Sequence, residues 1–92
     1  MNDLKRLEIA NICYANVSGS FAALANPKNR GPNFSWKNFP DMMSKSAKTW
    51  IYLNAVSGNS AENISVAEQF AREIANTLLD TDHSNFLEES IN

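Results

Sequence analysis

The 92-residue chain has very little cysteine and histidine, one residue of each, and this limits the chemistry it can carry. Cys13 cannot form a disulfide within the chain, which fits a reducing compartment. A zinc site needs several Cys or His ligands, so we expect no metal site. Nucleophilic catalysis needs a base beside the nucleophile, and a Cys13–His83 pair is possible in three dimensions, but nothing local supports it. We interpret Cys13 as a small buried residue of a helix.

Catalytic motifs are also lacking. The sequence contains no Gly-rich phosphate loop or dinucleotide fingerprint, and no pair of acids can be assigned to glycoside hydrolysis. We interpret the run around Asp80, Asp82 and His83 as a solvated acidic linker. The sequence therefore predicts a protein that is not an enzyme, with no cofactor and no small-molecule substrate.

Long apolar runs are lacking too. The existing runs are too short to span a bilayer, and the first ten residues do not show the basic-then-apolar order of a signal peptide. We expect a cytoplasmic protein without a membrane partner. The length predicts one domain over residues 1–92.

The charges that are present are strongly segregated along the chain. Residues 26–50 carry five basic residues against the single acid Asp41, which gives +4, whereas residues 51–92 carry seven acids against Arg72, which gives −6. Residues 1–25 are neutral, so the total is the formal net charge of −2. A polarised surface of this kind steers charged partners.

The apolar pattern predicts a helix that begins at about Asp3. Its expected buried stripe recurs in steps of three and four residues and comprises Leu7, Ala10, Tyr14, Val17, Phe21 and Leu24. The Ser18-Gly19-Ser20 run is a weak point that could divide the helix. Asn26-Pro27 ends it, and a loop with Pro27, Gly31 and Pro32 follows.

Residues 41–56 permit two interpretations. Pro40-Asp41 is a typical helix start and Gly58 a typical helix end, and both favour a helix with Met43, Ala47, Trp50, Ile51 and Ala55 on one face. The aromatic and branched residues 50–53 are also typical of a strand.

A further helix is predicted from Ser65 and Glu68, which match the capping-box pattern. We expect it to end near Asp80, and Ser84 to cap a short last helix. The predicted fold class is all-α, a small bundle of three main helices plus a short C-terminal helix. The alternative is an α+β fold in the order helix, strand, strand, helix. The predicted core residues are Phe21, Leu24, Trp50, Ile51, Phe70, Ile74 and Leu78.

The basic middle of the chain is the best candidate for a binding site, because lysine and arginine bind phosphates, aromatic rings stack on unpaired bases, and asparagine side chains bond to polar edges. Whether Phe34, Trp36 and Phe39 belong to the core or to an interface stays open. The candidate partner-binding or nucleic-acid-binding residues are Lys28, Asn29, Arg30, Asn33, Trp36, Lys37, Lys45 and Lys48.

In size, in its single domain and in its partly basic surface over residues 26–50, the chain resembles the small phage-encoded anti-defence proteins, including the anti-CRISPR proteins. That group shares no diagnostic motif, so the resemblance assigns no residue roles. It implies a large protein or ribonucleoprotein partner in the host bacterial cell. Lys28, Arg30 and Lys37 would then contact guide RNA or its phosphate-binding groove, and acids such as Glu62, Glu68 and Glu73 a basic protein patch.

Two alternatives involve nucleic acid directly. One is a small helical DNA-binding regulator that uses residues 41–56 as its reading helix, although a helix-turn-helix has a tighter turn than the Pro-rich loop offers. In the other, Gly31-Pro32 before a strand and the run from Ser65 resemble the double-stranded-RNA-binding domain. Val66 and Ala67 stand where that family has two lysines, so its phosphate clamp is missing.

Overall fold

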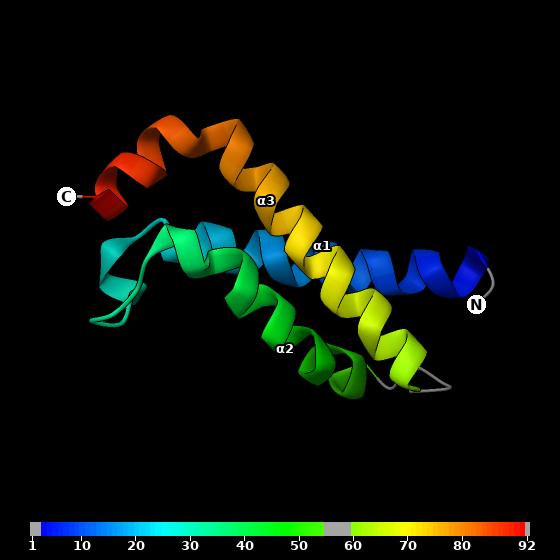
Figure 1. Ribbon diagram of the computed structural model, residues 1–92. Helices are drawn as coiled ribbons and strands as arrows, with labels where there is room; N and C mark the ends of the chain where they lie inside the picture. The colour runs from blue at the N-terminus through cyan, green and yellow to red at the C-terminus, as the bar shows by residue number, and fades with distance from the viewer. Residues whose placement is uncertain (1–2, 55–59, 92) are drawn as a thin grey trace.

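The computed structural model describes the backbone of residues 3–54 and 60–91 and the side chains of residues 3–54 and 60–81. Three helices make up the fold: α1 Asp3–Leu24, α2 Phe39–Leu53 and α3 Ala61–Ile91 (Figure 1). Two short 3-10 turns, η1 Pro27–Asn29 and η2 Trp36–Asn38, lie between α1 and α2. These described ranges contain no strand, so the all-α prediction is confirmed, and the α+β alternative and the double-stranded-RNA-binding topology are wrong.

Helix α1 is continuous through the Ser18-Gly19-Ser20 run, so this weak point does not divide the helix. Its buried residues are Ile9, Cys13 and Val17, spaced four apart. The predicted stripe is therefore wrong in part, because Leu7 and Tyr14 are exposed. The helix has apolar side chains on two adjoining faces, and α3 covers the one that contains Ile9 and Cys13.

Helix α2 confirms the helical interpretation of the middle segment. It begins at Phe39, with Pro40 in its first turn, where the missing N–H costs nothing. It ends at Leu53, where the side-chain amide of Asn54 donates to the carbonyl of Trp50 at 2.9 Å. Met43, Ala47 and Ile51 are buried on one face as predicted, whereas Ala55, Val56 and Gly58 lie outside the described residues.

Helix α3 begins earlier than predicted. The hydroxyl of Ser60, not that of Ser65, caps it by accepting a hydrogen bond from the Asn63 backbone N–H at 3.2 Å. The helix also does not end near Asp80; it continues to Ile91, and the separate short helix from Ser84 is not confirmed. Figure 1 shows that the axis of α3 turns in its orange C-terminal part.

The core lies where α3 packs against both other helices. The buried face of α3 is made of the small residues Ala67, Ala71 and Ala75, followed by Leu79. Small side chains allow the helix backbones to approach closely, and the Cys13 thiol donates to the Ala67 carbonyl at 3.4 Å. Of the predicted core residues, Ile51 is fully buried. The others pack against the core while partly exposed, and these are Phe21, Leu24, Trp50, Phe70, Ile74 and Leu78.

Candidate partner-binding surface

The loop between α1 and α2 is held against the end of α1 by two of the predicted site residues. The Asn29 side-chain amide donates to the Ala23 carbonyl at 2.7 Å, and Arg30 Nε donates to the Leu24 carbonyl, also at 2.7 Å. These carbonyls have no partner inside the helix, because the last turn of an α-helix leaves its acceptors unpaired. Asn29 and Arg30 therefore close the C-terminus of α1.

Arg30 also lies over two aromatic rings. Its guanidinium carbon is 5.5 Å from the Phe34 ring centroid and 5.4 Å from the Trp36 centroid, within the range of a cation–π contact. A half-buried side chain with these hydrogen bonds and ring contacts is largely occupied within the protein. The sequence suggested a solvent-directed cation at this position, whereas the structure shows one that braces the loop.

Trp36, a candidate binding residue whose place in the core or at an interface the sequence left open, is fully buried and offers no exposed ring face to a base. Its ring packs edge-on against Phe34 at 4.9 Å and Phe39 at 5.3 Å between centroids, and it lies 5.2 Å from Phe21. Phe39 is fully buried and Phe34 half-buried. The aromatic residues after the loop therefore belong to the core, where they attach the loop to α1 and α2.

The four lysines of the candidate set face solvent. Lys45 and Lys48 lie three residues apart on the outer face of α2, so they are neighbours on the helix surface. Lys37 lies in η2 just before α2, and Lys28 lies in η1 beside the end of α1. Within the described part of the chain, none of these lysines is in an ion pair.

The one acid of the basic segment, Asp41, has a partner on another helix. Its carboxylate accepts a hydrogen bond from the Arg72 guanidinium of α3. This hydrogen bond and the charge of Arg72 lower the pKa of Asp41, and the nearby charge of Lys45 acts in the same direction. The pairing compensates the one acid of residues 26–50 with a cation from the acidic half of the chain.

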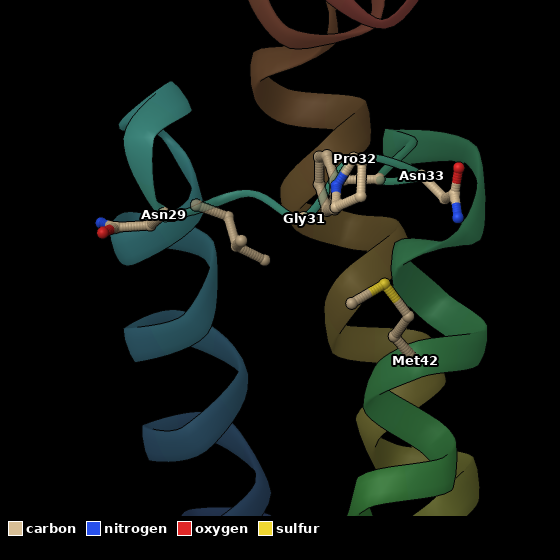
Figure 2. A pocket seen from close by; sticks show the side chains of 7 residues that line it. Asn29, Gly31, Pro32, Asn33 and Met42 are labelled. Atoms are coloured by element: carbon tan, nitrogen blue, oxygen red, sulfur yellow. The ribbon is translucent and has the colours of Figure 1, made fainter.

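A shallow pocket of about 380 Å³ lies between the loop and the start of α2. In Figure 2 the Met42 side chain reaches from α2 toward Gly31 and Pro32, while the amide groups of Asn29 and Asn33 lie on opposite sides of the pocket. Leu24 and Phe34 complete the lining. The sequence points to Asn29 and Asn33 but not to the apolar lining, because Leu24 and Met42 belong to different helices that meet beside the loop only in the folded chain.

The described residues include neither an activated cysteine nor a metal-binding cluster. Burial raises the pKa of the Cys13 thiol to about 11, which disfavours the reactive thiolate. Among the residues whose side chains are described, no group of three His, Cys, Asp or Glu side chains is placed to hold a metal ion. The side chains of Asp82 and His83 lie outside that set.

Comparisons with known proteins add no identity. No family model matches the chain, and no curated protein and no solved structure matches it. In the described part of the chain, no helix is long and apolar enough to cross a membrane.

Proposed function

We propose that the protein is a non-catalytic binding protein that docks on a larger nucleoprotein assembly, such as a CRISPR effector complex in the cytoplasm of a bacterial cell. It binds through the surface formed by Lys28, Lys37, Lys45 and Lys48, here called the basic surface, and it blocks access of nucleic acid. The observation that carries the proposal is that all four lysines are exposed without an ion-pair partner among the described residues.

The position of the acids supports a partner that is itself of mixed charge. Glu68 and Glu73 are exposed on α3, as are Glu62 and Asp80. Domains that bind free nucleic acid are usually basic overall, whereas this chain has ten acidic residues and a sequence pI of about 5.2. An assembly that exposes both anionic RNA and a basic protein surface complements both the lysines and the acids of the molecule.

The rigidity of the loop supports binding without a large ordering cost. The Asn29 and Arg30 hydrogen bonds and the buried Trp36 fix the loop on both sides of its apolar pocket. Pro27 and Pro32 restrict the backbone further. A pre-organised loop loses less conformational entropy on association than a flexible one. Lys28 and Lys37 are therefore displayed from a fixed framework.

A helical regulator of DNA or RNA is the second candidate, because Lys45 and Lys48 give α2 an outward basic face. It predicts direct binding to naked nucleic acid with a steep salt dependence. The first candidate predicts binding to an assembled complex that survives removal of unprotected nucleic acid.

The test is affinity capture from bacterial lysate with immobilised protein, with and without nuclease, followed by titration of the purified captured complex. Lys37→Glu and Lys48→Glu are compared with Lys5→Glu, which makes the same charge change on α1, away from the basic surface. We expect the first two changes to weaken binding at least about tenfold, roughly 1.4 kcal/mol, and Lys5→Glu to leave it unchanged.

The outcomes separate the two candidates. A nuclease-resistant nucleoprotein whose nucleic-acid binding is inhibited by the protein supports the first. Capture of nucleic acid alone, lost after nuclease, supports the regulator. Equal binding by the wild type, Lys37→Glu and Lys48→Glu would show that the basic surface is not the contact.

A further inference from the structure

The outer face of α1 presents apolar side chains that no other described residue covers. Leu4, Leu7 and Tyr14 are 79%, 58% and 61% exposed. Since successive residues of an α-helix turn by about 100°, these three residues and the exposed Asn11 all lie on one face. Figure 1 shows the dark-blue N-terminal part of α1 extending past its crossing with α3. Single exposed apolar residues are ordinary, but a row along one helix face indicates an interface.

The same face contains a hollow. Tyr14 of α1 lines a groove of about 290 Å³ together with four residues of α3, which are Glu73, Ile74, Thr77 and Leu78. Leu7 lies about two helical turns before Tyr14 on the same side of α1. One face of the molecule thus carries both a projecting leucine and an apolar groove that a leucine fits.

We propose that two copies of this chain form a dimer through the outer faces of their α1 helices, packed antiparallel about a two-fold axis near Asn11. In a two-fold interface each surface must complement itself, so a projection on one copy meets a hollow on the other, and the reverse. Antiparallel pairing places Leu7 of each copy on Tyr14 and the groove of its partner. Parallel pairing would place groove against groove and leave both unfilled.

The charges beside this face also favour a second, antiparallel copy of the chain as its partner. Arg6, whose guanidinium lies 5.1 Å from the Phe70 ring centroid, stands on the α3 side of the N-terminal half of α1. Glu73 stands on the same side, beside the C-terminal half. Antiparallel pairing brings Arg6 of one copy toward Glu73 of the other, and near the axis two Asn11 amides, each both donor and acceptor, can bond to one another.

The first experiment measures the solution mass of the full chain over a range of concentrations by sedimentation equilibrium. The wild type is expected to approach twice the chain mass of 10.2 kDa. Leu7→Asp should raise the dimer dissociation constant at least about tenfold. Leu53→Asp is the matched control, because Leu53 is 78% exposed on α2, away from the proposed interface, and it should dimerise as the wild type does. Circular dichroism confirms that each variant folds.

A cross-link test fixes the orientation. Asn11→Cys should give a covalent dimer on mild oxidation, because the two positions meet at the axis. Ala22→Cys should not, because in an antiparallel pair its two copies stand roughly 33 Å apart. A wild type that stays monomeric at every concentration overturns the proposal. Equal dimerisation by Leu7→Asp, or cross-linking through Ala22→Cys instead of Asn11→Cys, overturns the interface or its direction.

Discussion

The guanidinium of Arg72 on α3 binds the carboxylate of Asp41 on α2, although Glu68 stands one helical turn before Arg72 on its own helix. This contact does not follow from the sequence, because the two residues are 31 positions apart. The ion pair joins the basic and acidic halves of the chain across the contact between α2 and α3.

This pair predicts a pH dependence of stability. The pKa of Asp41 is lowered below its ordinary value of 3.8, so its contribution to stability is fully present above that value and is lost as pH falls through the lower, folded-state pKa. Asp41→Asn should therefore lower the melting temperature at about pH 6 but much less at about pH 2. Because both side chains are exposed, the difference should shrink in 1 M salt. A variant with the same deficit at both pH values would contradict the assignment.

Arg30 should behave as a structural residue. Arg30→Ala removes its bond to the Leu24 carbonyl and its contacts with Phe34 and Trp36, and we expect a loss of about 1–3 kcal/mol of unfolding free energy. Arg30→Lys should recover little of it, since an ammonium lacks the planar fork. Lys28→Ala, two residues away and exposed, is the control and should be neutral within about 0.5 kcal/mol in urea unfolding. Comparable losses in Lys28→Ala would disprove the bracing role.

Helix α2 could be predicted because local signals at both ends agreed with its apolar spacing. The buried face of α1 could not be predicted, because two rows of residues are apolar at helical spacing, one with Leu7 and Tyr14 and the other with Ile9 and Cys13. Which of the two rows is buried depends on where α3 lies. The predicted start of α3 was wrong for a similar reason, because Ser60 and Ser65 are both possible N-caps. The helix begins after Ser60, and this places Asn63 in the buried face of α3.

The candidate site also has features that the sequence predicts and features that it does not. That Lys28, Lys37, Lys45 and Lys48 face solvent follows from the cost of burying a charge and was predictable. That Asn29 and Arg30 bond to the last carbonyls of α1 was not, because it depends on how the loop turns back. Trp36 follows no periodic pattern, so only the structure shows that it is in the core.

Cys13 should be unreactive in the folded protein. Its thiol is fully buried, and its pKa is raised from 9.0 to about 11, so labelling by a disulfide reagent at about pH 8 should require unfolding. The same shift predicts that stability falls as pH rises from 9 toward 11, because the unfolded chain then ionises its thiol while the folded chain keeps its proton. Cys13→Ala should flatten this alkaline loss. Rapid labelling in native buffer would show instead that α1 and α3 separate readily.

Ala71 should tolerate no larger side chain, because it lies at 0% exposure in the middle of the face of α3 that the other helices cover. Ala71→Leu adds three carbons where helix backbones pack closely, and we expect a loss of about 1–3 kcal/mol, a large part of the roughly 5–15 kcal/mol that holds a domain folded. Ser65→Leu, at an exposed position of the same helix, is the control and should change stability by less than about 0.5 kcal/mol. Urea unfolding compares the two. If Ala71→Leu is as stable as Ser65→Leu, the alanine face of α3 does not set the spacing between the helices, and the packing that positions α2 and its lysines must come from the aromatic residues around Trp36.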